Sequence, residues 1–114
     1  MTKYVRILQE TGVHNNYNIK CVSDITQSIS KVQPFCAKQV ICIWSYECTE
    51  HDQFMKWIYK EYATQKGKGD WFNFTGTEIK DVIKNLEENK TRFHDPNFFH
   101  TTKTIFYHGL NNLY

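Results

Sequence analysis

Lysine side chains are the groups whose clustering most clearly suggests chemistry in this sequence. Lys56, Lys60, Lys66 and Lys68 lie close together near the middle of the chain. Such a group can contact the phosphates of a nucleic acid, and the same pattern is also typical of a solvated helix face. The net charge of +2 is too small to indicate a nucleic-acid partner by itself. The residues predicted to contact nucleic acid are Lys20, Lys56, Lys60, Lys66 and Lys68.

Cysteine and histidine side chains are the candidates for metal binding. The cysteines form no C-x-x-C pair and are Cys21, Cys36, Cys42 and Cys48. In apolar surroundings a free cysteine behaves as a small hydrophobic residue, so we expect reduced thiols. A zinc site would need Cys48 and His51 to converge with His94 and His100, spacings only loosely compatible with zinc. We therefore predict no metal site.

The composition predicts one domain. A chain of 114 residues with 16% aromatic side chains can build a single hydrophobic core. No apolar run approaches the roughly 20 residues needed to cross a bilayer. The first residues lack the pattern of a cleaved signal peptide. We therefore expect an intracellular protein with no membrane partner.

The first part of the chain has the pattern of a β-hairpin. Residues 3–10 place Val5 and Ile7 on one face of a strand, and residues 17–23 form a second strand. Gly12 lies in the turn between them.

A helix and a strongly apolar strand are predicted next. Asp24 is placed as the N-cap of a short helix that Pro34 ends. Residues 39–47, QVICIWSYE, are apolar nearly throughout, which predicts a central strand covered on both faces.

Two further helices follow. Thr49 is predicted to cap the first of them, and Gly67 to end it. Thr75 and Glu78 form a T-x-x-E capping box before the second. Its predicted buried stripe consists of Ile79, Val82, Ile83 and Leu86.

The order of elements predicts an α/β (α+β) fold, with a small, mainly antiparallel three-stranded sheet flanked by helices. We place the domain at residues 1–90 and an aromatic C-terminal extension at residues 91–114. Exposure of so many apolar side chains to water would be costly, so we expect this extension to pack against protein. It either packs on its own sheet, with residues 102–108 as an added strand, or forms the contact between two copies in a dimer.

The sequence resembles a known family in two stretches. Residues 17–33, YNIKCVSDITQSISKVQ, are followed by a strand, a helix and residues 69–79, GDWFNFTGTEI. This pattern is similar to the GIY-YIG endonuclease domain, in the form common in phages and large DNA viruses, and covers residues 3 to about 88. In this fold Trp71 and Phe72 would pack against the sheet and the preceding helix.

The resemblance implies a DNA-cleaving site. The family uses a divalent metal ion held by a glutamate, a tyrosine that activates water, and an arginine that stabilises the phosphate. Tyr17 matches the tyrosine of the second motif, Tyr4 lies near that of the first, and the motif glycine falls at Lys20. The arginine position falls near Gln27 or Ser28.

The position of the metal-binding glutamate falls at Met55, which cannot bind a hard cation. We therefore expect a catalytically degenerate scaffold, in which the vestigial site candidates are Tyr4, Tyr17, Glu50 and Glu61.

The favoured function is that of a non-catalytic binding module, from a virus or mobile element, which contacts a nucleic acid or a protein inside the host cell, in its cytoplasm or nucleus. No cofactor is expected for it. One alternative is an active endonuclease that uses Mg²⁺ or Mn²⁺ at a remodelled site with Glu50 or Glu61 and Lys60. The other is a homodimeric protein-interaction factor.

Overall fold

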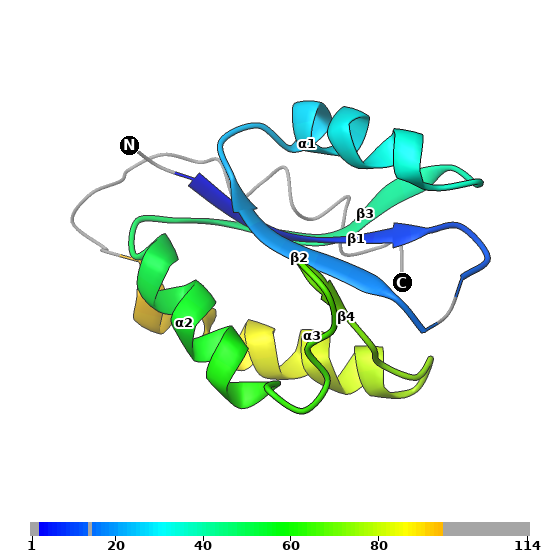
Figure 1. Cartoon of the computed structure of the whole chain (residues 1–114). Coiled ribbons are helices and arrows are strands. Elements are labelled where there is room, and N and C mark those ends of the chain that lie inside the picture. Colours follow the sequence, from blue (N-terminus) through cyan, green and yellow to red (C-terminus); the bar gives the residue numbers. More distant parts are fainter. Residues whose placement is uncertain (1–2, 14, 95–114) are drawn as a thin grey trace.

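The computed structural model describes residues 3–13 and 15–94, which form a four-stranded antiparallel sheet with three α-helices (Figure 1). This confirms the predicted fold class, with one strand more than expected. The elements in chain order are β1 Lys3–Glu10, β2 Tyr17–Val22, α1 Ile25–Val32, η1 Gln33–Phe35, β3 Val40–Cys48, α2 His51–Glu61, β4 Trp71–Phe72, α3 Glu78–Asn89 and η2 Lys90–Phe93, where η is a 3-10 helix.

The strands lie in the order β3-β1-β2-β4, so the prediction that residues 39–47 form a central strand is wrong. β3 is an edge strand of the described sheet, and β1 and β2 are its centre. The apolar run of β3 reflects burial on both faces, because helices cover each side of the sheet. Coverage of the faces and the number of neighbouring strands are independent properties, and hydrophobicity reports only the first.

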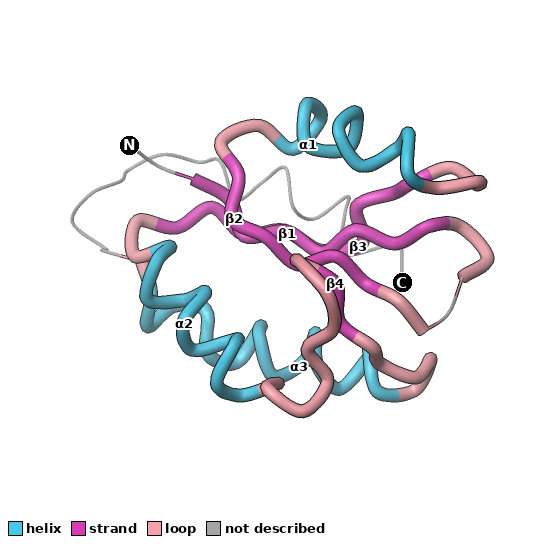
Figure 2. The backbone as a smooth tube through the Cα atoms, in the orientation of Figure 1, coloured by secondary structure: helices cyan, strands magenta, loops and turns pink. Residues whose placement is uncertain are grey.

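The helices cover the sheet unequally (Figures 1 and 2). α1 lies on one face, and α2 and α3 lie on the other. The main core lies on the α2 and α3 side and includes Trp44, Phe54, Ile58 and Leu86. A smaller cluster lies under α1 and consists of the buried Leu8, Val40 and Cys42, with Ile25, Ile29, Val32 and Cys36 packed against it.

Local signals set the start of two helices as predicted. The Asp24 carboxylate accepts a hydrogen bond of 2.9 Å from the Gln27 backbone N–H, so Asp24 is the N-cap of α1. Both capping-box hydrogen bonds before α3 are present, since Thr75 N–H donates to Glu78 Oε1 at 2.8 Å and Glu78 N–H donates to Thr75 Oγ at 3.1 Å. The helix itself begins at Glu78, with Thr77 at its N-cap position. The predicted buried stripe of α3 is also confirmed.

Two predicted helix signals were wrong. α2 has Glu50 rather than Thr49 at its N-cap position, one residue later than predicted. The same helix ends at Glu61, well before Gly67. Gly67 instead permits a close approach within the next loop, where its N–H donates to the Trp71 carbonyl at 2.7 Å and a Cβ would lie 3.2 Å from that oxygen.

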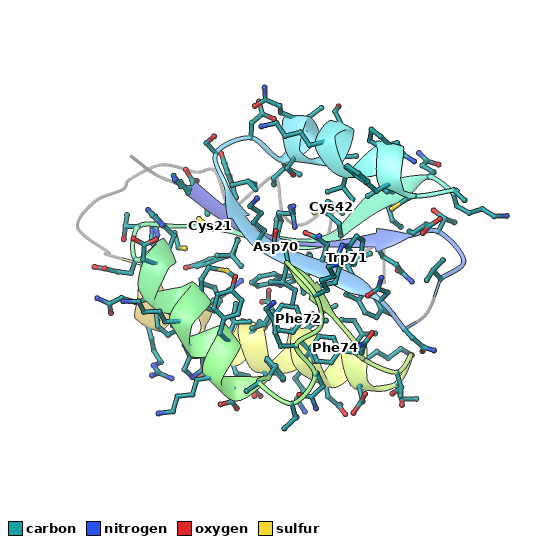
Figure 3. The ribbon with its side chains drawn as sticks, in the orientation of Figure 1. Cys21, Cys42, Asp70, Trp71, Phe72 and Phe74 are labelled. Atoms are coloured by element: carbon teal, nitrogen blue, oxygen red, sulfur yellow. The ribbon has the colours of Figure 1, made fainter. Side chains whose placement is uncertain are left out.

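The aromatic segment after this loop forms β4 and pairs with β2, with Phe72 opposite Tyr17. Phe72 is fully buried and stacks on Phe74 with ring centroids 5.8 Å apart. Both side chains point toward the α3 layer (Figure 3). The predicted packing of Phe72 against the preceding helix is confirmed by its stacking on Tyr59, but the segment is itself an edge strand of the sheet and Trp71 is only partly buried. Gly69, with a φ of 61°, makes the turn before it.

The described core continues past the predicted boundary at residue 90. Phe93 is 7% exposed and stacks face to face on Phe54, with centroids 4.7 Å apart. Its carbonyl also accepts a hydrogen bond of 2.9 Å from the Glu50 N–H. The strand predicted at 102–108 lies outside the described residues. No helix within the described ranges is both long and apolar enough to span a membrane.

Candidate anion-binding cleft

A polar cleft of about 270 Å³ lies between β2, α1 and the residue that precedes β4. Its charged lining residues come from four separate parts of the chain and are Lys3, Arg6, Lys20, Asp24, Lys31 and Asp70. Four cations and two carboxylates leave a formal charge of +2 in this small volume. The cleft therefore favours an anion on charge alone.

Arg6 is the buried member of this group. The central strand β1 carries it toward α1, and its side chain is 1% exposed. Its Nε donates to Ser28 Oγ at 3.1 Å. One terminal nitrogen, Nη1, donates to the Asn18 carbonyl at 3.0 Å and to Asn18 Oδ1 at 2.6 Å. These bonds hold the guanidinium plane in one orientation between β2 and α1.

The polar residues that are buried in the described part of the chain form one cluster around this guanidinium. They are Arg6, Asn18, Ser28 and Ser45. Ser45 lies opposite Arg6 in the pairing of β1 with β3. Asn18 and Ser28 accept the hydrogen bonds that the Arg6 guanidinium donates. Buried polar groups cost stability unless they are paired. Because these buried polar residues gather around Arg6 beside the cleft, this part of the interior is a candidate binding site.

The charge of Arg6 lacks a close counter-ion. The ion pairs within the described residues join Lys20 to Asp70, His51 to Asp52 and Lys90 to Glu87, and none involves Arg6. Burial lowers the pKa of Arg6 to about 10, an effect that Cys42 and Asp70 partly oppose. The group stays charged at neutral pH, and an anion in the cleft would supply the missing negative charge.

The rim of the cleft is more exposed. The Lys20 side chain is 53% exposed and lies 3.7 Å from the Asp70 carboxylate, so this pair is solvent-screened and weak. The carboxylate of Asp24 is engaged in capping α1. Because the side chains of Lys20 and Lys31 are exposed, they can turn toward an incoming anion at little cost in free energy. Arg6 is already held in place by its hydrogen bonds.

The five lysines predicted to bind nucleic acid lie on β2, on α2 and in the loop before β4. Lys20 lies on the α1 face of the sheet, opposite Arg6 in the β1–β2 pairing. Lys56 and Lys60 are exposed on α2, which covers the other face. Lys66 donates to the carbonyls of Gly67 and Gly69 and lies over the rings of Tyr59 and Phe72. Lys68 is exposed in that loop.

The vestigial nuclease candidates are also separated. Tyr4 pairs with Val22 and Tyr17 with Gln9, so the two tyrosines lie at opposite ends of the hairpin and point to opposite faces. Tyr17 packs against Phe74 in the main core.

Both glutamate candidates are exposed, and they lie at opposite ends of α2. Glu50 is its N-cap and Glu61 its last residue. Met55 lies between them and is buried.

The candidate metal ligands are also placed. All four cysteines are free thiols, as expected. The imidazole of His51 contacts Asp52 at 3.1 Å, and His100 lies outside the described residues. Residues 3–13 and 15–94 hold no group of three or more His, Cys, Asp or Glu side chains that could bind a metal ion.

Arg6 is the residue that sequence reasoning missed. Alternation places Arg6 on the strand face opposite Val5 and Ile7, and the sequence pattern assigns it no role there. A signal was present, because a lone arginine stands in the apolar run VRIL. A charged residue in such a run is rarely buried without a partner or a ligand.

Comparison of the chain with protein-family models, with curated proteins and with solved structures finds no match. The resemblance to the GIY-YIG domain therefore stays a prediction.

Proposed function

We propose that this protein is a non-catalytic binding module that holds phosphate groups of a nucleic acid in the Arg6 cleft. The observation that carries the proposal is a buried, oriented guanidinium without a carboxylate partner, on the wall of a cleft with net positive charge. A structural role alone would favour an apolar residue here, because replacing buried charges by packed hydrophobic residues is often neutral or stabilising.

The free donors of Arg6 suit a phosphate. Its second terminal nitrogen, Nη2, makes no hydrogen bond within the described residues. Guanidinium groups bind phosphate oxygens through charge-assisted hydrogen bonds, which are about twice as strong as neutral ones. Because Ser28 and Asn18 already fix the side chain, little rotamer entropy is lost on binding.

Binding without cleavage is proposed because the position that the resemblance implies for the catalytic arginine falls near Gln27 or Ser28, and the position implied for the glutamate falls at Met55. The proposal predicts no cutting of plasmid DNA with Mg²⁺ or Mn²⁺. It would fail in this respect if Mn²⁺ at millimolar concentration raised the melting temperature and Glu50→Ala or Glu61→Ala removed the shift.

Two pairs of exposed lysines decide which surface binds. We compare Lys20→Ala/Lys31→Ala, at the cleft, with Lys56→Ala/Lys60→Ala, on α2. Fluorescence anisotropy with a labelled duplex and a labelled single strand, between 50 and 200 mM salt, gives the slope of log K against log salt. About four phosphate contacts give a slope near −3.6 for duplex DNA, and each lost contact reduces it by about 0.9.

The cleft proposal expects the Lys20/Lys31 variant to lose affinity and slope, and the Lys56/Lys60 variant to retain both. The reverse result would place binding on α2 and overturn the proposal. Binding that ignores salt, or none at about 50 mM salt, would also overturn it. Arg6→Gln, checked for folding by circular dichroism, should also bind more weakly than the unaltered protein and than the Lys56/Lys60 variant.

A further inference from the structure

Phe35 is an outlier on the surface of the protein. Its side chain is 86% exposed, and the other large exposed hydrophobic residue of the described chain, Tyr59, is 38% exposed. Tyr59 also stacks on Phe72, with ring centroids 6.1 Å apart. A single exposed aromatic residue is common, so its meaning depends on where it lies.

Helical periodicity indicates that Phe35 projects from the same side of α1 and η1 as the cleft, although it is not one of the residues that line the cleft. The backbone stays helical from α1 through η1, since Val32 and Gln33 both have right-handed helical angles. At about 100° per residue in an α-helix and about 120° in a 3-10 helix, Phe35 falls in the angular sector of Ser28 and Lys31. Both of those residues line the cleft.

Hydrogen bonds fix the backbone segment that adjoins the exposed Phe35. The side chain of Gln33 donates to the Lys38 carbonyl at 2.9 Å and accepts from the Val40 N–H at 2.8 Å. The Lys38 N–H in turn donates to the Glu10 carboxylate at 2.7 Å. These bonds fix the segment between η1 and β3, so the aromatic ring is presented at a defined place.

We propose that the cleft takes a single-stranded nucleic acid, with one unpaired base stacked on Phe35 and the adjoining phosphates on Lys31 and Arg6. This inference rests on the proposed function and names its substrate class. Lys31 and Phe35 are one turn apart, about 6 Å along the helix. That distance is comparable to one or two nucleotides of a strand at about 3.4 Å each.

Stacking selects for a single strand because duplex bases are already paired and stacked on each other. Proteins that bind single strands combine a basic groove with aromatic side chains, and this arrangement tolerates any base sequence. The cleft provides the first feature and Phe35 the second. No base-edge donor or acceptor is required, so we expect little sequence specificity.

The test uses the full chain and three labelled 12-mers: single-stranded oligothymidylate, an abasic strand of equal length and charge, and a duplex. Phe35→Ala should weaken binding of the oligothymidylate by roughly 5- to 150-fold, the contribution of one stacked base. Binding of the abasic strand and of the duplex should not change. Phe35→Trp should restore stacking, and Tyr59→Ala, the matched aromatic control on α2, should bind as the unaltered protein does.

Each other result has a distinct meaning. If Phe35→Ala binds oligothymidylate normally while Lys20→Ala/Lys31→Ala does not, the stacking inference fails and the phosphate cleft stands. If Phe35→Ala weakens the binding of all three 12-mers equally, the ring acts through the fold or through phosphate contacts, and the inference also fails. Phe35-dependent binding to anionic vesicles, with none to any oligonucleotide, would overturn both proposals. A uridine 12-mer bound more tightly than the oligothymidylate would support the inference and assign the strand to RNA.

Discussion

Replacing Phe93 with alanine is expected to destabilise the folded domain by about 3–5 kcal/mol, the usual range for a buried phenylalanine. Phe93 is 7% exposed, and its ring stacks on Phe54 with an interplanar angle of 5°. Trp57 lies 5.9 Å away on the same side of the sheet. The change removes these ring contacts and leaves a cavity, while the backbone bond from Glu50 to the carbonyl of residue 93 can persist.

The loss expected from Phe93→Ala can be compared with the total free energy of unfolding of the protein. At roughly 0.05–0.15 kcal/mol per residue, a chain of this length has a stability of about 6–17 kcal/mol. The substitution therefore removes a large fraction of it. With a urea m-value of about 2 kcal/mol/M, a loss of about 4 kcal/mol lowers the unfolding midpoint by about 2 M.

The matched control is the same chemical change at an exposed site. Phe35→Ala removes a ring that is 86% exposed, so its effect on stability should stay within about 0.5 kcal/mol. Urea unfolding of both full-length variants, followed by tryptophan fluorescence and circular dichroism, gives the comparison. Trp57 is a suitable reporter because it contacts the altered position.

The reasoning is refuted if Phe93→Ala shifts the midpoint no more than Phe35→Ala does. The domain boundary predicted at residue 90 would then be adequate.

Two truncated chains extend the test. A chain that ends at Lys90 should be strongly destabilised, because it loses Phe93. A chain that ends at His94 tests the predicted strand at 102–108: unchanged stability and mass would exclude both the added strand and the dimer contact.

Three further predictions concern local structure. Thr75→Ala should cost about 1 kcal/mol in urea unfolding, because it removes the hydroxyl that accepts from the Glu78 N–H, and no loss would mean that the capping box is idle. Gly69→Ala should cost about 1–2 kcal/mol, since its φ is 61°, whereas Gly76→Ala, with open space at its Cβ, should be nearly neutral. Stability should fall as the pH rises above about 9, because burial raises the pKa of Cys48 from 9.0 to about 12 and only the unfolded chain releases that proton. Cys48→Ala should flatten this alkaline slope in melting experiments, and an unchanged slope would contradict the assignment.

The sequence predicts those elements whose signals are local. The capping box at Thr75 and Glu78 needs only the residues between them, and the stripe of α3 needs only helical periodicity. The N-cap at Asp24 is likewise contained within one turn. These features survive in any fold that buries one face of the helix.

The position of β3 and the burial of Arg6 could not be predicted in this way. Both depend on partners far along the chain: β3 packs beside β1, and Arg6 is covered by α1 through Ser28. Alternation shows that Arg6 faces away from Val5, but it cannot show that a helix will cover that face.

The cleft escaped sequence analysis for a related reason. Its cations lie on β1, β2 and α1, and no two of them are close in sequence except Lys3 and Arg6. The clustering that drew attention was along the chain, at Lys56 to Lys68, whereas the clustering that makes the cleft exists only in space.

The two sides of the sheet differ in cohesion, and this has a consequence for exchange of backbone hydrogens with solvent. α1 is attached through a small cluster around Leu8 and through the bond from Arg6 to Ser28, whereas α2 and α3 share the large core. Amides of α1 should therefore exchange through a local detachment of that helix, and amides of β1 only through complete unfolding. An anion that bridges Arg6 and Lys31 would hold α1 in place. Slower deuterium uptake in residues 25–32 would then report occupancy of the cleft without any label on the protein.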